Sequence, residues 1–247
     1  FETGGKRYTS LENALAAAKD GDTITLRGPL DIENADPIEV SKNIILNLNG
    51  HTLSKSREKA LLCILGSNVV IANGTVRSTC VSKSANAVEV GKFRHTGAKL
   101  TLDNVILEGS IGGGTGVRGR GLFICTGNEA VIMSGKVIGG IYTEGALTMS
   151  GGSAEQLKLG LLDNIPVTLS GGSFDSIKIG NDADYQSLLA GGYAYQKKDG
   201  ALVKLSEMNE NTAVTVVKCS HPDDHSGGNV CPYCGYAAEV TKPDGSI

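Results

Sequence analysis

A short cassette recurs along most of the chain, and it restricts the fold more than any other feature of the sequence. Each copy is an alternating apolar run, a small polar residue, a glycine or asparagine, and a second apolar step. The copies lie at 45–53, 69–76, 100–107, 131–138, 147–153 and 167–173. The last two are the most alike and share a Ser-Gly-Gly-Ser core. Repetition at a period of about 20–30 residues predicts a stacked solenoid.

In such a solenoid each copy contributes short strands that stack about 4.8 Å from the strands of its neighbours. Glycine and asparagine suit the corners because both tolerate a left-handed backbone conformation. We therefore expect Asn49 and Asn73 to stack as a ladder of side-chain amides, and Asp103 to occupy the same corner position in its copy.

The composition supports many short strands with their own core. Of the 247 residues, 34 are glycine, 6 are proline and 40% are hydrophobic, which argues against disorder and allows a core without disulfides. The net charge is only -3 and no run of lysine or arginine occurs, so a nucleic-acid surface is not expected. No stretch of about 18 apolar residues is present, so no transmembrane segment is expected.

The first segment has the pattern of a capping helix. Residues 10–19 place Leu11, Leu15 and Ala18 on one face, and Ser10 or Thr9 can cap the N-terminus. A strand is expected at 23–26, directly after the helix. An amphipathic helix at this place can cover the open end of a solenoid.

The helix, the Asp-Gly-Asp-Thr-Ile sequence that begins at Asp20 and the Asn-Gly corner at Asn49 together resemble pectate-lyase-like parallel β-helix proteins. The resemblance covers most of residues 6–205. It implies an all-β fold, a single-stranded right-handed parallel β-helix at 1–205 with an N-terminal capping helix. A linker at 206–215, a small zinc-ribbon-like segment at 216–240 and a tail at 241–247 complete the expected organisation. Lyases, hydrolases, tailspikes and adhesins share this fold, so the resemblance does not select an activity.

The end of the repeat region is expected to be a helical turn from Tyr185 followed by a closing hairpin, since Asp199-Gly200 is a strong hairpin-turn signal. The stretch 188–195 resembles the end of repeat modules in surface proteins of Gram-positive gut bacteria. This second resemblance implies a protein that is secreted or displayed on the surface of a bacterium.

Three of the six cysteines gather near the C-terminus. Cys219, His221, Cys231 and Cys234 supply the four soft ligands of a closed structural zinc site, with His225 as the alternative to His221. A disulfide between Cys219 and Cys231 or Cys234 remains an alternative. The Cys-Pro-Tyr-Cys sequence is also a redox motif, which needs a helix N-terminus within a βαβ core. Cys63 and Cys125 lie in apolar runs and are expected to be buried core residues.

Residues of a binding site are expected where the cassette is interrupted, in the loops 92–97 and 109–121. The candidate ligand-binding residues are Arg94, His95, Arg118 and Arg120, which can hold an anionic sugar. Tyr142, Tyr193 and Tyr195 can stack on a sugar ring or close the end of the solenoid.

The repeats contain no pair of adjacent aspartates of the kind that glycoside hydrolases need. The sequence therefore favours a non-catalytic extracellular or cell-surface module: a structural stalk, an adhesin-like module or a glycan-binding one. A polysaccharide or a host or cell-surface glycan is the expected partner. The alternative is a polysaccharide lyase or glycoside hydrolase acting on an acidic glycan. That alternative requires Arg94, Arg118, Arg120 and Asp103 to meet in one groove.

Overall fold

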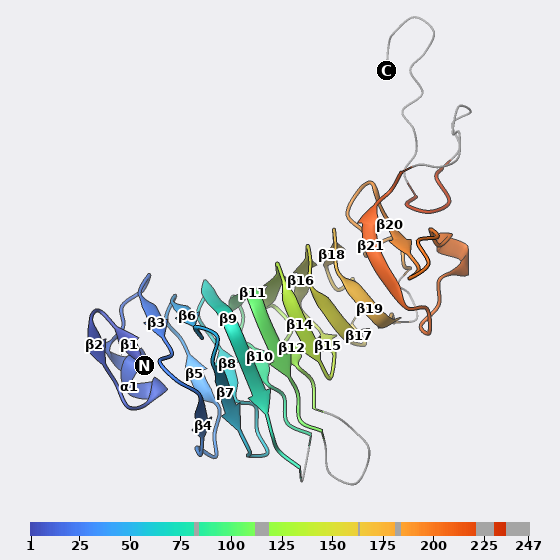
Figure 1. Cartoon of the computed structure of the whole chain (residues 1–247). Coiled ribbons are helices and arrows are strands. Elements are labelled where there is room, and N and C mark those ends of the chain that lie inside the picture. Colours follow the sequence, from blue (N-terminus) through green and yellow to red (C-terminus); the bar gives the residue numbers. More distant parts are fainter. Residues whose placement is uncertain (82–83, 112–118, 163, 181–183, 221–229, 236–247) are drawn as a thin grey trace, which may run out of the picture.

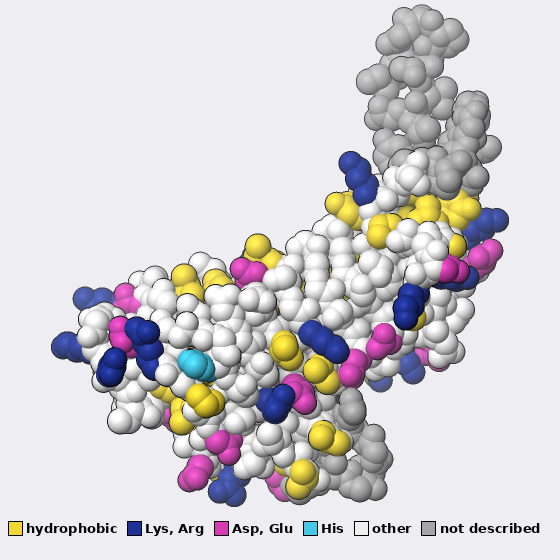
Figure 2. Space-filling view, in the orientation of Figure 1, with side chains coloured by type: hydrophobic (Ala, Val, Ile, Leu, Met, Phe, Trp, Pro, Cys, Tyr) yellow, Lys and Arg dark blue, Asp and Glu magenta, His cyan; other side chains and the backbone are white. Residues whose placement is uncertain are grey.

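The computed structural model describes residues 1–81, 84–111, 119–162, 164–180, 184–220 and 230–235. Within these residues the chain is nearly all β, with a mostly parallel sheet and one α-helix. The strands follow one another in sequence order along an elongated molecule (Figure 1), and the space-filling view in the same orientation shows the same elongated body (Figure 2). The predicted all-β class, parallel pairing and N-terminal helix are confirmed.

The parallel pairs form three ladders. Ladder 1 contains β3 (Thr23–Thr25), β6 (Ile45–Asn47), the first parts of β9 (Val69–Ser78) and β11 (Lys99–Glu108), β13 (Glu129–Ile132), β16 (Ala146–Met149) and β18 (Val167–Leu169). Ladder 2 contains β4 (Leu30–Ile32), β7 (Thr52–Lys55), the second parts of β9 and β11, β14 (Gly135–Ile138), and the first parts of β17 (Ser153–Leu159) and β19 (Ser173–Lys178). Ladder 3 contains β5 (Ile38–Val40), β8 (Leu62–Ile64), β10 (Val88–Val90), β12 (Leu122–Ile124), β15 (Ile141–Thr143), and the last parts of β17 and β19. The chain passes through the three ladders in turn, so neighbours within a ladder come from successive copies of the cassette.

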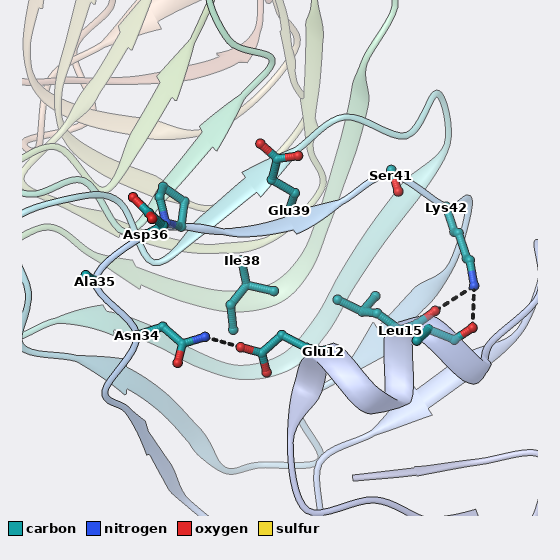
Figure 3. A pocket seen from close by; sticks show the side chains of 11 residues that line it. Glu12, Leu15, Asn34, Ala35, Asp36, Ile38, Glu39, Ser41 and Lys42 are labelled. Carbon is teal, nitrogen blue, oxygen red and sulfur yellow. Dashed lines mark hydrogen bonds between the residues drawn. The ribbon is translucent and has the colours of Figure 1, made fainter.

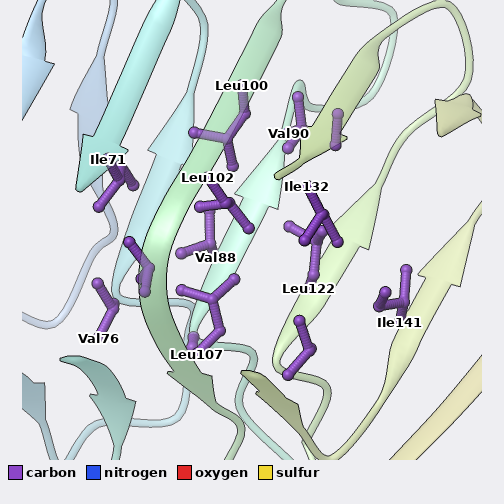
Figure 4. Close-up of a cluster of buried hydrophobic side chains, with 14 of the residues drawn as sticks. Ile71, Val76, Val88, Val90, Leu100, Leu102, Leu107, Leu122, Ile132 and Ile141 are labelled. Atoms are coloured by element: carbon purple, nitrogen blue, oxygen red, sulfur yellow. The ribbon is translucent and has the colours of Figure 1, made fainter. Parts of the chain in front are cut away.

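The apolar positions of the cassette form the core. In ladder 1 one inward position is occupied in register by Ile24, Leu46, Ile71, Leu102, Ile132, Met149 and Leu169, each at most 1% exposed. Leu107 from ladder 2 and Leu122 from ladder 3 lie in the same buried cluster (Figure 4). Since strand side chains alternate between two faces, the intervening residues lie on the outside.

Asparagine occupies the corner between ladders 1 and 2. Asn49, Asn73 and Asn104 have left-handed φ angles of 52°, 58° and 54°. The Asn104 amide donates to the Asn73 side chain at 3.2 Å, and the Asn73 amide donates to Asn47, not Asn49, at 3.4 Å. The expected amide ladder is present, but Asn47 takes the place predicted for Asn49.

Asp103 does not hold the corner position that the sequence predicts for it. It pairs in register with Ala72, and Asn104 is the residue with the left-handed backbone. The Asp103 carboxylate instead accepts a hydrogen bond of 2.8 Å from the Ser134 hydroxyl, one copy further along the chain.

The N-terminal end is closed by α1 (Leu11–Ala17). The Ser10 hydroxyl caps this helix by accepting a hydrogen bond from the Asn13 N–H at 3.2 Å, as predicted. At the other end of the helix, the ammonium group of Lys42 donates to the carbonyls of Leu15, Ala16 and Ala18. The short antiparallel pair of β1 (Glu2–Thr3) and β2 (Lys6–Arg7) continues onto β3, and so extends the sheet at this end.

The C-terminal end changes from parallel to antiparallel pairing. Strand β20 (Tyr193–Gln196) pairs with β21 (Val214–Lys218), which also pairs with β19. Residues 185–188 form a turn, and Gly200 has the positive φ of 89° that the predicted hairpin requires. Tyr195 is fully buried and donates from its hydroxyl to the Tyr185 carbonyl at 2.8 Å, so it closes the end of the core.

The segment predicted as a linker, 206–215, overlaps the 3-10 helix η1 (Leu205–Glu207) and the start of β21. The sheet therefore continues across the predicted boundary between the repeats and the cysteine-rich segment. No helix in the described part of the chain is long and apolar enough to cross a membrane.

Candidate functional site

Three cysteine thiols converge at the C-terminal end of the described chain. Cys219 directly follows β21, and its N–H donates to the Gly192 carbonyl at 2.8 Å. Cys231 and Cys234 lie in a turn that the Gly235 N–H closes by donating to the Cys231 carbonyl at 2.8 Å. The three sulfur atoms lie within 4.8 Å of one another, and all three residues are buried. The turn and the end of β21 thus form a compact set of soft ligands.

The spacing of these sulfur atoms fits a metal site better than a disulfide. The Sγ atoms of Cys219 and Cys231 are 3.9 Å apart, whereas a disulfide bond measures about 2.05 Å. Two thiolates bound to tetrahedral zinc at about 2.3 Å each would lie about 3.8 Å apart. Cys219, Cys231 and Cys234 can therefore bind a metal ion. His221 and His225, the two predicted alternatives for the fourth ligand, lie outside the described residues.

The described residues around Cys231 do not provide the setting that the redox interpretation needs. Cys231 is followed by a turn, not by the first turn of a helix, and the described strands around it are β20 and β21, paired antiparallel. A helix N-terminus is what lowers the pKa of the attacking thiol in such motifs.

The predicted ligand-binding residues lie at different edges of the ladders. Arg94 and His95 follow β10, in a loop where the Gly97 N–H donates to the Gly127 carbonyl just beyond β12. Arg120 lies at the opposite end of the same short strands, two residues before β12 begins. Asp103 lies on β11, directly before Asn104, the corner residue between ladders 1 and 2. The described members of the set therefore do not meet in one groove, and Arg118 lies outside the described residues.

The surroundings of Arg94 and His95 suggest a structural loop. The Arg94 guanidinium lies 5.0 Å from the ring centroid of its neighbour Phe93, which is exposed. The His95 carbonyl accepts from the Asn128 side chain at 2.8 Å, and the Asn128 carboxamide oxygen accepts from the Ala98 N–H at 2.9 Å. Asn128 is buried, so its amide holds this corner together.

Arg120 has different neighbours. Its guanidinium carbon lies 4.1 Å from the ring centroid of Tyr142 and 5.4 Å from that of Phe123. The strand register places these two rings side by side on the outer face of ladder 3. Tyr142 was among the tyrosines expected to contact sugar, but Phe123 was not singled out from the sequence. Aligning the copies would have found it, because Phe123 and Tyr142 are the middle residues of successive ladder-3 strands.

A hollow of about 520 Å³ lies between α1 and β5, and its charged groups already have partners (Figure 3). The Glu12 carboxylate accepts from the Asn34 amide, and the Lys42 ammonium group binds the carbonyls at the end of the helix. Asp36 and Glu39 pair with Lys59 and Lys92, outside the hollow. We interpret this hollow as part of the helix packing.

Cys63 and Cys125 are protonated thiols at neutral pH. Burial is the main cause that raises the pKa of Cys63 to about 12 and that of Cys125 to about 11, and the nearby Glu89 carboxylate adds to both shifts. Cys63 is 4% exposed and Cys125 is half-buried, so the expected burial applies fully to Cys63 and partly to Cys125. Neither thiol has the lowered pKa of a nucleophile.

Comparisons of the chain with protein-family models, with curated proteins and with solved structures give no match.

Proposed function

We propose that the chain is a non-catalytic extracellular or cell-surface module of a bacterium, built as a right-handed parallel β-helix. Three parallel ladders around one continuous core, with a helix at one end and an antiparallel strand pair at the other, support this fold. Such an arrangement is stiff because each copy binds its neighbours along all three ladders. A stiff rod suits a stalk or a display surface.

One observation carries the non-catalytic part of the proposal. Asp103, Arg120 and the pair Arg94–His95 lie at three separate edges of the ladders. General acid and base groups have to reach the same substrate atoms within hydrogen-bond distance, which separate edges do not allow. The described residues therefore favour a surface that binds or spaces over the alternative of a lyase or hydrolase.

Incubation with acidic and neutral polysaccharides tests this proposal. The reaction is followed by reducing-end formation and by the absorbance of unsaturated uronate products, over a range of pH and with added calcium. We expect neither signal to exceed that of heat-denatured protein. Product formation that depends on folded protein would overturn the proposal in favour of the lyase or hydrolase.

We further propose that zinc is the metal held by Cys219, Cys231 and Cys234, and that its role is structural. Zinc prefers thiolate and imidazole ligands in a closed tetrahedral set, and three buried thiols supply most of that set. Bound zinc would tie the Cys231–Cys234 turn to the end of β21. It would then stabilise a short segment that buries little apolar surface of its own.

The fourth ligand is tested with His221→Ala and His225→Ala. We expect one of these substitutions to weaken zinc binding strongly, as measured by competition with a chromogenic chelator, and the other to leave it unchanged. Equal affinity in both variants and in the unaltered chain would exclude histidine ligation at this site.

A further inference from the structure

The outer face of ladder 3 has an ordered sequence of side chains. In each strand of this ladder one outward residue directly follows a buried apolar residue, and the parallel register aligns these outward residues along the rod. In order they are Glu39, Cys63, Glu89, Phe123, Tyr142, Lys158 and Lys178. The aromatic pair therefore lies between an acidic half and a basic half of one stripe.

The aromatic pair positions Arg120. The Phe123 and Tyr142 ring centroids are 5.5 Å apart with the rings tilted by 44°, and the Arg120 guanidinium lies over both. A cation over ring faces is held by the ring quadrupole. The backbone of Arg120 is fixed as well, since its N–H donates to Asn86 Oδ1 and its carbonyl accepts from the Ala87 N–H, both at 3.0 Å. The guanidinium is thus held in place before any ligand arrives.

Two cations at this position have no carboxylate partner within salt-bridge distance among the described residues. They are Arg120 and Lys158, whose ammonium group lies 5.8 Å from the Tyr142 ring centroid. Lys178, the next residue along the stripe, is paired with Glu210, and Lys92 near the acidic half is paired with Glu39. Positive charge on the stripe is therefore balanced at its ends and not at the aromatic pair.

A carboxylate lies beside this positive charge, and its hydrogen bond is to the tyrosine of the group. The Glu144 carboxylate accepts a hydrogen bond of 3.3 Å from the Tyr142 hydroxyl. The group therefore combines a guanidinium, an ammonium, ring carbons, a phenol oxygen and one carboxylate. Two cations and one carboxylate leave a net charge of one, which matches a singly charged anion better than a multiply charged phosphate, and a phosphate would make no use of the rings.

We propose that Arg120, Lys158, Phe123 and Tyr142 form a binding site for a sugar residue that has a single carboxylate, such as a uronic or sialic acid. The guanidinium suits the carboxylate because its planar donors match the two oxygens. Ring carbons that the two cations do not cover contact C–H groups of the sugar, while the Tyr142 hydroxyl and the Glu144 carboxylate bond its hydroxyls. This inference deepens the proposed surface module by naming its ligand class, and it rests on that proposal for its biological setting.

Titration calorimetry with four soluble probes tests the site. The acids are trigalacturonate and 3′-sialyllactose, and their uncharged counterparts are methyl-esterified trigalacturonate and lactose. We expect saturable binding of at least one acid, weakened by added salt, and no binding of its counterpart. The pair that binds identifies the source of the carboxylate. Absence of saturable binding by both acids, or equal binding of an acid and its counterpart, would overturn the inference.

Three variants locate the site. Arg120→Gln should weaken the acid at least tenfold and Lys158→Gln severalfold. Lys136→Gln removes an exposed cation of β14, on ladder 2, and should leave affinity unchanged. Lys158 is exposed, so its variant keeps the test informative if Arg120→Gln does not fold. If Arg120→Gln and Lys158→Gln both bind the acid as tightly as the unaltered chain does, any binding site lies elsewhere. Sugar cleavage during the titrations would instead count against the non-catalytic proposal and leave this site intact.

Discussion

The corner asparagine Asn73 is the most informative single position for testing the ladder arrangement. Its φ of 58° is left-handed, its amide donates to Asn47, and its carboxamide oxygen accepts from Asn104. Asn73→Ala removes both amide contacts and puts an unsuited side chain at a left-handed position. Asn73→Gly removes the same contacts but suits the backbone.

The magnitudes follow from these two roles. A left-handed conformation costs an ordinary residue about 1–2 kcal/mol, and two exposed amide hydrogen bonds contribute about 1 kcal/mol together. We therefore expect Asn73→Ala to lower the free energy of unfolding by about 2–3 kcal/mol. Asn73→Gly should lower it by about 1.5–2 kcal/mol, because the greater freedom of glycine in the unfolded chain adds about 0.5–1 kcal/mol to the lost contacts.

Equilibrium urea unfolding, followed by far-ultraviolet circular dichroism, measures both variants. The comparison is between the two variants, which lose the same amide contacts and differ in backbone preference. Equal stabilities, or a less stable glycine variant, would refute the assignment of a left-handed corner at this residue.

Three further predictions concern the core, the cap and the thiols. Leu102→Ala should lower the free energy of unfolding by about 2–5 kcal/mol in urea titrations, since Leu102 is 1% exposed in the middle of the buried stack; a loss below about 1 kcal/mol would contradict this packing. Ser10→Ala should cost about 1 kcal/mol by removing the helix cap, and Ser10→Asp should restore most of it. The pKa of Cys63 is raised to about 12, so its contribution to stability is full below pH 9 and is lost as pH rises toward 12. Cys63→Ala should therefore lose less stability between pH 9 and 11 than the unaltered chain does. If the free energy of unfolding falls equally with pH in both proteins, the raised pKa is contradicted.

The sequence predicted the parts of the fold that depend on local periodicity. Leu11, Leu15 and Ala18 marked the helix face because a helix repeats every 3.6 residues, and all three are buried. The cassette likewise marked strands and corners. The prediction that Asp103 occupies the corner was wrong. Asp and Asn both tolerate a left-handed backbone, so the sequence Asp103-Asn104 does not reveal which of the two residues adopts it.

One of the two candidate sites could be predicted from the sequence, and the other could not. Cys231 and Cys234 are close in sequence, and their convergence with Cys219 followed from spacing and ligand chemistry. The cluster of Arg120 with Phe123 and Tyr142 depends on strand register, which brings residues from different copies together. Residue types alone could not show that Arg120 lies over two rings while Arg94 lies over only its neighbour Phe93.

The metal content of the reduced, folded chain tests most directly whether its C-terminal end is closed by a structural metal. Native mass spectrometry, after zinc is supplied and excess is removed by dialysis, should show one zinc per chain. Cys231→Ser should lose that zinc, because Cys231 is fully buried within the three-thiol cluster. A fully reduced and folded chain that retains no zinc, or a Cys231→Ser variant that retains it with unchanged affinity, would contradict the account.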